Sequence, residues 1–353
     1  MSIVGHRPLK LAIVGTMFGA YGVAAAARQV EGMEVIAICG KDPEKTAARA
    51  KEYNIPRTYT SWRTMLDEMQ PDLCAIITPP HASGEICAEA LARGIGVMVE
   101  KLPAGDRLQT QQLAALAEQK NIANVADYIY PQLHTFRAVQ DWLQDGRIGA
   151  TLSARVDWLF ESYDVRKKSD SWKLWPDQGG GLVAFFLSHV LYYCEYLFGH
   201  ATTVQAHVED KTGRGGETLA IILLKTTSGI PIHINGCNAM PPGDPEHRIT
   251  ILGERGKIII QNPGANPMRD FTAECFDGNG NCLAAAAEKD YIPDDKITDS
   301  RAWPVARLLQ NLHEQACGQP ESFYVPHLRD AARVHQLVDA VRSSNQTQEV
   351  VHV

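Results

Sequence analysis

The chain has 353 residues, of which 45% are hydrophobic and 21% are charged, and this length and composition are typical of a globular protein with two domains. A formal net charge of −7 argues against a nucleic-acid-binding protein, because such proteins carry a basic stripe. The first residues contain no apolar signal core and the eight scattered cysteines form no CxxC pair, so we expect a cytoplasmic protein with reduced thiols and no metal site.

Strand-like and helix-like segments alternate through the first 126 residues. The strand-like segments are continuous apolar runs, as expected for a parallel sheet that is covered on both faces. One helical segment begins at Asp42, whose carboxylate can cap the helix. The pattern predicts a Rossmann domain, a doubly wound parallel sheet, over residues 1–126. The predicted strands are residues 9–15, 34–39, 72–78, 96–100 and 121–126, and the predicted helices are residues 22–30, 42–53, 83–94 and 107–120.

The loop after the first strand reads "GTMFGAYG". A dinucleotide-binding loop usually reads GxGxxG, but here Met17 and Ala20 occupy the second and third glycine positions. The place of the loop, between a strand and a helix N-terminus, still favours a phosphate site, and an ordinary strand-to-helix turn is the alternative. The residues expected to contact a cofactor are Gly15, Thr16, Met17, Phe18 and Gly19.

The second predicted strand is followed by Gly40 and Lys41. NAD-specific domains usually carry an acid there, which binds the ribose hydroxyls. A cation in place of the acid favours the 2′-phosphate of NADP(H), while NAD(H) stays possible. The alternative is that Lys41 is a solvated surface lysine.

The apolar strand at 96–100 ends in the charged pair Glu100-Lys101, and Leu102-Pro103 follows. Burying either charge without a partner is costly. The strand could therefore simply emerge into water at this point. Alternatively, the pair serves a ligand, because α/β proteins bind ligands at the carboxyl ends of parallel strands.

Residues 127–353 have a different pattern, with period-two alternation and turn signals that predict an open, mostly antiparallel sheet in an α+β domain. The apolar stretch at 181–199 predicts a buried helix, since Ser188, His189 and Glu195 would be costly in lipid. We expect this domain to bind substrate and to form oligomers. The predicted strands are residues 151–162, 203–210, 217–227, 230–237, 247–254 and 256–261, and the predicted helices are residues 134–149, 302–317 and 326–343.

Six segments, spread over essentially the whole chain, carry a family resemblance. They are "LKLAIVGT", "KDPEKTAARAKEYNI", "PDLCAIITPP", "VMVEKLPAG", "GGGLVAFFLSHVLYYCEYLFG" and "ITILGERGKIII". In their order and spacing they resemble the glucose–fructose oxidoreductase, inositol dehydrogenase and rhizopine-catabolism (Gfo/Idh/MocA) family. The fold of that family is therefore expected here.

The resemblance implies a nicotinamide cofactor in a cleft between the two domains. It also implies a homodimer or homotetramer formed through the outer face of the C-terminal sheet. Lys101 would reach the nicotinamide ribose and the substrate, and Glu100 would support the same region. The segment after the fourth family strand would add Thr78, Pro79 and Pro80 to the cofactor site.

Several positions depart from the family pattern. The proline of its Glu-Lys-Pro motif is replaced by Leu102. The Asp that lies four residues before the helix histidine, His189, is replaced by Phe185. Tyr128 stands where the Arg of an Asn-x-Arg segment is expected. The loop "GTMFG" resembles that of thiazolinyl imide reductases, a divergent branch of the family.

These departures bear on the chemistry. In the family the helix histidine accepts a hydroxyl proton during oxidation, and the neighbouring Asp stabilises its imidazolium. Phe185 gives His189 an apolar neighbour that disfavours the imidazolium, whereas Lys101 can donate a proton to a carbonyl or imine. We therefore predict Lys101 and His189 as the catalytic residues of a reductase. The alternative for His189 is a buried helix histidine.

Aromatic residues are frequent in the segments expected to face the substrate. They favour a substrate that is more apolar or ring-like than a free hexose, and the alternative is that most of them are core. The segment "SWKLWPDQGGG" resembles a mobile Trp-Arg loop of the family, in which Lys173 could bind an anion or simply be exposed. The predicted substrate contacts are Tyr128, Trp172, Lys173 and Phe185.

The combined prediction is an NADP(H)-dependent oxidoreductase that reduces a C=O or C=N group of a sugar-derived or cyclic biosynthetic intermediate. The alternative is a cofactor-binding regulator without turnover, which the lost Asp would permit. A glycosidase that uses its cofactor transiently fits the missing Asp and the aromatic residues less well. Neither nucleic acid nor a membrane is expected as a partner.

Overall fold

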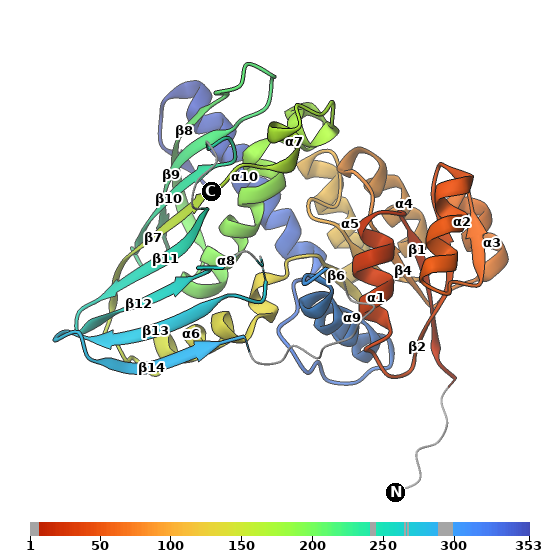
Figure 1. The fold of residues 1–353 in the computed structure, drawn as a ribbon, viewed down its shortest axis with the longest axis horizontal. Helices are drawn as coiled ribbons and strands as arrows, with labels where there is room; N and C mark the ends of the chain where they lie inside the picture. Colours follow the sequence, from red (N-terminus) through yellow and green to blue (C-terminus); the bar gives the residue numbers. More distant parts are fainter. Residues whose placement is uncertain (1–6, 241–244, 265, 267, 289–298) are drawn as a thin grey trace, which may run out of the picture. The chain divides into compact units, whose positions relative to one another are not determined.

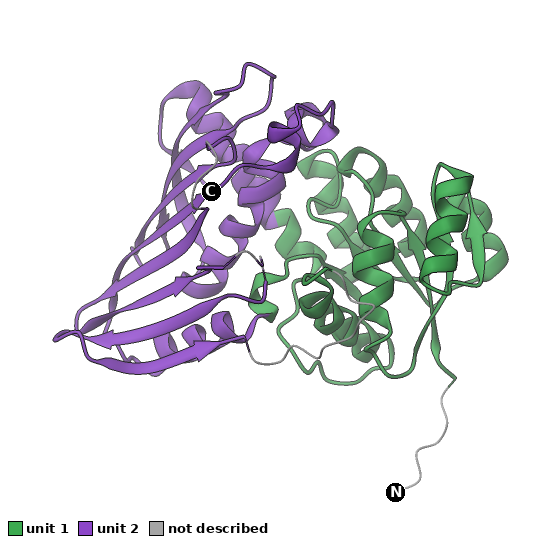
Figure 2. Cartoon of the chain, viewed as in Figure 1, with its two compact units in different colours: residues 1–132, 292–332 green, residues 133–291, 333–353 purple. Residues whose placement is uncertain are grey.

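The computed structural model describes residues 7–240, 245–264, 266, 268–288 and 299–353. The chain forms two compact units, residues 1–132 with 292–332 and residues 133–291 with 333–353 (Figure 2). The predicted fold class is confirmed, because the first unit contains a parallel sheet and the second a mostly antiparallel one. The division at residue 126 did not anticipate that a C-terminal segment returns to the first unit.

The first unit is built on a six-stranded sheet in the order β3-β2-β1-β4-β5-β6, in which every pair is parallel (Figure 1). This is the strand order of a dinucleotide-binding fold. Every residue of β4 and β5 is buried, which explains why these strands read as continuous apolar runs. The strands are β1 Leu9–Val14, β2 Met33–Cys39, β3 Arg57–Tyr59, β4 Leu73–Ile76, β5 Gly96–Val99 and β6 Asn124–Ala126.

The helices of the first unit largely follow the predicted pattern. The carboxylate of Asp42 accepts a hydrogen bond from the Lys45 backbone N–H, as expected of a cap. β3 and α3 were not predicted, because β3 has only three residues and none of them is buried. The helices are η1 Gly19–Ala24, α1 Ala25–Ala27, α2 Pro43–Glu52, α3 Trp62–Met69, α4 Pro80–Ala92, α5 Arg107–Gln119, η2 Tyr130–Gln132 and α9 Ala302–Ala316. α9 packs against β5 and β6.

The second unit is built on a nine-stranded sheet in the order β14-β13-β12-β11-β7-β10-β9-β8-β15. Its strands pair antiparallel except for β7 and β10, which run parallel. Buried residues recur at every second position of β11, at His247, Ile249 and Ile251, which confirms the period-two interpretation. The strands are β7 Thr151–Leu159, β8 Ala201–Glu209, β9 Leu219–Thr226, β10 Pro231–Cys237, β11 Glu246–Gly253, β12 Gly256–Gln261, β13 Thr272–Asp277, β14 Cys282–Ala287 and β15 Val351–His352.

Helices of the second unit pack on this sheet, with α6 against β12 to β14 (Figure 1) and η5 against β9 and β10. The helical stretch 176–198 is long and apolar enough to cross a membrane, but 72% of its most apolar window is buried inside the protein. This agrees with the predicted buried helix. The helices are α6 His134–Gln144, α7 Tyr163–Arg166, η3 Trp172–Leu174, η4 Pro176–Gln178, η5 Leu182–Leu187 and α8 Ser188–Phe198, and α10 Leu328–Thr347 connects the two units.

An aromatic cluster in the core of the second unit encloses His247 of β11. The imidazole stacks on the ring of Trp158, with 4.5 Å between centroids and 11° between planes. Its Nε2 lies 3.2 Å from the hydroxyl oxygen of Tyr193. Burial lowers the pKa of His247 to about 3, because the charged imidazolium loses its hydration in this cluster.

We expect His247 to make the protein sensitive to acid. In the unfolded chain the His247 imidazole is protonated near pH 6.5, whereas in the folded chain it is protonated only near pH 3. Stability is therefore lost as the pH falls through this window, by up to about 1.4 kcal/mol per pH unit. Urea unfolding of the wild type and of His247→Phe at pH 7 and pH 5 measures the effect. Between pH 7 and pH 5 the unfolding free energy of the variant should depend less steeply on pH, by the uptake of about one proton. An equal pH dependence in the two proteins would contradict this assignment.

Candidate functional site

The carboxyl ends of the parallel strands bring most of the predicted cofactor residues to one edge of the first sheet. Because neighbouring parallel strands end on the same side, Gly15 follows β1, Gly40 follows β2 and Thr78 comes two residues after β4. Glu100 follows β5 and Asp127 follows β6. This edge is where open α/β sheets bind their ligands.

The loop after β1 approaches the end of β4 so closely that only glycine fits. Gly15 has a φ of +124°, and a Cβ atom there would lie 2.1 Å from the carbonyl oxygen of Ile77. Its N–H donates to the Cys39 carbonyl oxygen of the neighbouring strand at 2.9 Å. The loop then enters a helix at Gly19, where a Cβ would lie 2.9 Å from the Ile13 side chain. Bare backbone and a helix N-terminus suit a pyrophosphate, so this edge fits a dinucleotide.

The side chains of this loop take different roles. Met17 is 50% exposed, whereas the ring of Phe18 is buried. Phe18 packs edge-on against Tyr21 with 5.8 Å between centroids, and the Arg301 guanidinium lies 4.4 Å from the Phe18 ring centroid. Arg301 is in turn held by two-pronged hydrogen bonds to Asp299. Neither Arg301 nor Asp299 was predicted from the sequence, because both belong to the returning C-terminal segment.

At the end of β2, Lys41 is exposed, as the sequence allowed. The nearest carboxylate in sequence, Asp42, is engaged with the Lys45 N–H at 3.0 Å as the cap of α2. Thr16 of the first loop borders this strand end, because a Cβ on Gly40 would lie 2.3 Å from the Thr16 methyl group. The end of β2 therefore presents a cation and a capping carboxylate that is already hydrogen-bonded.

The segment after β4 is fixed by side-chain hydrogen bonds. The Thr78 hydroxyl lies 2.8 Å from the Ser83 hydroxyl, and the Ser83 hydroxyl donates to the Thr78 carbonyl oxygen, also at 2.8 Å. Pro79 and Pro80 start α4, three residues earlier than the sequence pattern predicted. These contacts hold the predicted segment at the carboxyl edge of the sheet.

The charged pair after β5 is not a solvated strand end. Glu100 is half-buried, and Lys101 is only 7% exposed. The Glu100 N–H donates to the Ile76 carbonyl oxygen at 3.0 Å, which continues the pairing with β4. The peptide bond between Lys101 and Leu102 is cis although residue 102 is not proline. The structure thus contradicts the first interpretation of this stretch, a strand that emerges into water.

Asp127 is a further acidic residue at this edge, and it was not predicted from the sequence. It is 5% exposed, and its N–H donates to the Val99 carbonyl oxygen at 2.9 Å. Its Oδ1 atom is buried and has no hydrogen-bond partner among the described residues. Burial, and then the negative charge of Glu100, raise the pKa of the Asp127 carboxyl well above its usual range, while Lys101 acts in the opposite direction. An acid directly after the last strand is the signal that could have identified it.

The predicted substrate residues fall into two groups. Tyr128, next to Asp127, is fully buried, and burial raises the pKa of its hydroxyl further above its usual range. The other three lie together in the second unit. Trp172 meets Phe185 edge-on with 5.5 Å between centroids, and the Lys173 ammonium lies 5.2 Å from the Phe185 ring centroid and 3.7 Å from Asp164.

His189, the second predicted catalytic residue, is in the first turn of α8 and is half-buried. The glycines before its helix are fixed by packing, since Gly181 has a φ of +86° and a Cβ there would overlap the Glu217 carboxylate. Arg342 donates to the Glu217 Oε1 atom at 2.9 Å and to the Gly180 carbonyl oxygen at 3.1 Å. The start of this helix is therefore held rigidly within the second unit.

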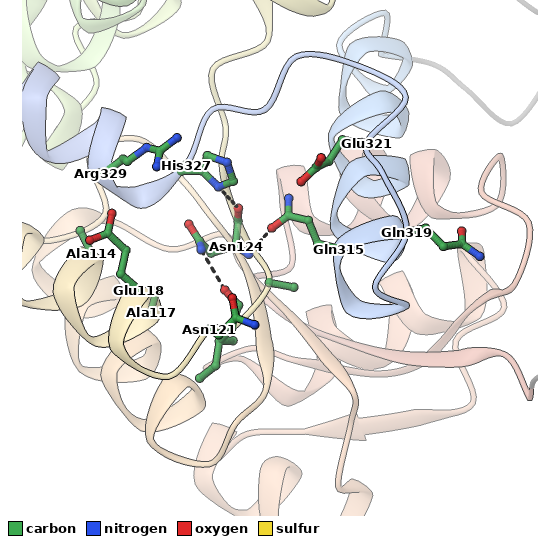
Figure 3. Close-up of a pocket in the computed structure, with 12 residues that line it drawn as sticks. Ala114, Ala117, Glu118, Asn121, Asn124, Gln315, Gln319, Glu321, His327 and Arg329 are labelled. Atoms are coloured by element: carbon green, nitrogen blue, oxygen red, sulfur yellow. Dashed lines mark hydrogen bonds between the residues drawn. The ribbon is translucent and has the colours of Figure 1, made fainter.

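A polar pocket of about 320 Å³ lies at the amino end of β6, and Figure 3 shows its lining. Asn124, 8% exposed, is at its centre and accepts at Oδ1 from the Leu328 N–H while donating from Nδ2 to the Ile122 carbonyl oxygen. The Asn124 N–H donates to Gln315, and its carbonyl oxygen accepts from His327. The pocket includes none of the predicted site residues, and these bonds fasten the returning segment to β6.

The part of the chain that the structure describes offers no group of three or more His, Cys, Asp or Glu side chains that could hold a metal ion. All eight cysteines are free thiols. A cofactor at this edge would therefore be held by backbone and by the charged groups named above.

Comparison with known proteins gives the family context. Residues 9–127 match a family model described as an oxidoreductase family with an NAD-binding Rossmann fold. Residues 136–259 match a model described as a GFO/IDH/MocA C-terminal domain. The two matches together cover well over half of the chain, in the order that the family resemblance implied.

Individual relatives are distant. The chain is 26% identical over 293 residues to a D-apiose dehydrogenase of Paraburkholderia graminis, covering 80% of this chain and 73% of that protein. It is 24% identical over 276 residues to an uncharacterized oxidoreductase of Synechocystis, covering 74% of this chain and 73% of that protein. Among solved structures, levoglucosan dehydrogenase in complex with NADH superposes with a TM-score of 0.86 at 17% identity, over 98% and 99% of the two chains. An Agrobacterium radiobacter oxidoreductase in complex with NAD+, L-tartaric acid and magnesium superposes with a TM-score of 0.81 at 20% identity, over 98% of each chain.

Proposed function

The chain belongs to the Gfo/Idh/MocA family of nicotinamide-dependent oxidoreductases, and from this we propose that it is an NADP(H)-dependent reductase. Its reaction is hydride transfer to a C=O or C=N carbon of a sugar-derived or cyclic intermediate. The observation that carries the proposal is the buried Lys101 at the carboxyl edge of the first sheet, on the same edge as the glycine-only loop at Gly15.

Each element of the first unit has a role in this reaction. The backbone from Gly15 to Gly19 holds the pyrophosphate, and the segment from Thr78 to Pro80 borders the nicotinamide half. The bound cofactor supplies the hydride. Lys101 donates the proton that the substrate oxygen or nitrogen needs, and the buried position of the ammonium excludes competing water. His189, in the second unit, stays a proposed catalytic residue.

The substrate class rests on relatives and on side chains. D-apiose dehydrogenase and levoglucosan dehydrogenase are named for a sugar and an anhydrosugar, which supports a sugar-related substrate. In the second unit, Trp172 and Phe185 offer flat apolar rings and Lys173 offers a cation. Such a surface suits a ring that bears polar substituents.

We also propose a homodimer or homotetramer formed through the second sheet. Ile221, Leu223 and Leu252 are exposed large apolar side chains on its strands, and apolar patches of this kind mark association surfaces. The predicted cytoplasmic location stays a prediction.

The preference for NADPH can be tested at Lys41. Replacing Lys41 by alanine should weaken NADPH binding about tenfold and leave NADH binding unchanged, because only NADPH carries the 2′-phosphate that the ammonium would pair with. Fluorescence titration of both cofactors measures the effect. Lys45→Ala, an exposed lysine on α2, is the matched control. A wild type that binds NADH more tightly than NADPH would overturn the preference.

The reductase proposal itself is tested with a substrate panel. The purified protein is mixed with NADPH and with keto sugars, sugar lactones and cyclic imines, and the absorbance of the reduced nicotinamide is followed. Turnover of at least one carbonyl or imine compound is expected. Tight NADPH binding with no turnover across the panel would favour the alternative, a cofactor-binding regulator.

A further inference from the structure

The carboxyl edge of the first sheet holds one buried acid that the reaction outlined above does not use. Asp127 follows β6, and Lys101 comes two residues after the end of the neighbouring strand β5. Val99 pairs with Ala126, and the Asp127 N–H donates to the Val99 carbonyl oxygen, so the acid is fixed next to the Glu100-Lys101 turn. Its Oδ1 atom is buried and has no hydrogen-bond partner among the described residues.

This position matters because the chain carries phenylalanine, and no carboxyl group, at position 185. Phe185 occupies the place from which a carboxylate was expected to support the helix histidine. A buried carboxyl oxygen without a hydrogen-bond partner costs free energy, so its presence calls for an explanation, and a role in the reaction is one. At Asp127 the first unit supplies a carboxyl group beside the lysine itself.

We propose that Asp127 is a positioning residue for Lys101, which it orients and to which it returns a proton after each reduction. The inference rests on the proposed reductase function and adds to it a named proton source. With Asp127 in this role, residues of the first unit donate and replace the proton, and no carboxylate is needed at position 185.

The surrounding charges are consistent with a carboxyl that keeps its proton. Burial is the largest effect on Asp127, and Glu100 adds to it. Both raise the pKa of the carboxyl. Asp299, from the segment before α9, also raises it, whereas Lys101 and Arg301 lower it, and the net direction is upward. The net upward direction of the pKa favours the protonated, neutral form of the Asp127 carboxyl.

Protons and electrons balance in the proposed reduction. The hydride forms a new C–H bond at the substrate carbon, the C=O or C=N π bond breaks, and Lys101 transfers a proton to the resulting oxygen or nitrogen anion. The neutral Lys101 amine then takes the proton of the Asp127 carboxyl. Asp127 is reprotonated from solvent by way of the half-buried Glu100, so the net reaction consumes one reduced cofactor and one proton.

Asp127→Asn keeps the shape of the side chain but cannot supply a proton. We expect kcat to fall on the order of 10²-fold, with KM and NADPH affinity unchanged. In the plot of kcat against pH, the decrease on the alkaline side reflects loss of the Asp127 proton in the wild type. The pH of this decrease should shift in the variant. Asp127→Glu should recover part of the rate, and Asp106→Asn, which removes the charge of an exposed helix-capping carboxylate in the same unit, should change none of these values.

A second readout does not depend on turnover. Infrared difference spectra of the protein without substrate, wild type minus Asp127→Asn at pH 7, should contain the C=O stretch of a protonated carboxylic acid. A carboxylate band in its place, or an Asp127→Asn variant with wild-type kcat and an unchanged pH profile, would overturn the inference and leave the reductase function intact. A wild type without turnover on any compound would instead overturn the reductase function, whatever the infrared result.

Discussion

Replacing Lys101 by alanine is expected to lower kcat by about 10²- to 10⁴-fold, the range over which a positioned acid or base contributes to a rate. Lys101 is the buried cation at the carboxyl edge, and its removal takes away the proton donor in the proposed mechanism. NADPH binding should weaken only modestly, because in the proposed site the backbone around Gly15, and not Lys101, would hold the pyrophosphate. Steady-state kinetics and a cofactor titration on the same preparation separate the two effects.

Two further variants serve as comparisons for Lys101→Ala. Lys120→Ala removes another lysine of the first unit, whose Nζ donates to the Ala92 carbonyl oxygen, and should leave kcat unchanged. Lys101→Arg keeps the charge but holds its proton too firmly to release it, so it should stay close to Lys101→Ala. A Lys101→Ala variant with kcat within threefold of the wild type would remove Lys101 from the mechanism.

The second large effect is expected at Gly15. Alanine there would be strained at a φ of +124°, and its Cβ would lie 2.1 Å from the Ile77 carbonyl oxygen, which belongs to the backbone and cannot move aside cheaply. We expect Gly15→Ala to destabilise the first unit by about 3 kcal/mol or more and to abolish cofactor binding. Thermal unfolding with and without NADPH measures both effects.

Gly94 provides the matched control for Gly15. It also has a positive φ, +78°, but a Cβ there would meet nothing within 4 Å. Gly94→Ala should therefore cost only about 1–2 kcal/mol, the strain of the backbone alone, and keep cofactor binding intact. Equal losses in the two variants would mean that the close approach to Ile77 plays no special role.

Much of the first unit could be predicted because its physics is local. Parallel strands that are buried on both faces read as apolar runs, and Asp42 caps its helix from an adjacent position. The carboxyl edge then follows from strand direction alone, which is why the predictions at Gly15, Thr78 and Glu100 lie on one edge. Trp172 and Lys173 were predicted as substrate contacts from the resemblance to a Trp-Arg loop and Phe185 from its place four residues before His189, and the structure brings these three side chains together in the second unit.

What the sequence could not provide depends on contacts between distant parts of the chain. Arg301 reaches Phe18 only because residues 299–332 return to the first unit. The burial of Asp127, and with it the raised pKa, depends on the groups around the end of β6 rather than on its neighbours in sequence. β13 and β14 were not predicted, and in β14 three of the six residues, Cys282, Leu283 and Ala285, are exposed without a clear alternation.

The parallel pairing of β7 with β10 is a similar case. These strands are separated by more than 70 residues, and neither carries a sign of its partner's direction. The alternating pattern indicated a mostly antiparallel sheet and could not locate the one parallel pair.

The most direct measurement is calorimetric titration of the wild-type protein with NADPH and with NADH. The account predicts one dinucleotide per chain, NADPH as the tighter ligand, and a dissociation constant on the order of 1–100 μM, within the range of enzyme Michaelis constants. Absence of binding heat for either nucleotide up to millimolar concentration, confirmed by an unchanged melting temperature, would contradict the assignment of the carboxyl edge as a cofactor site.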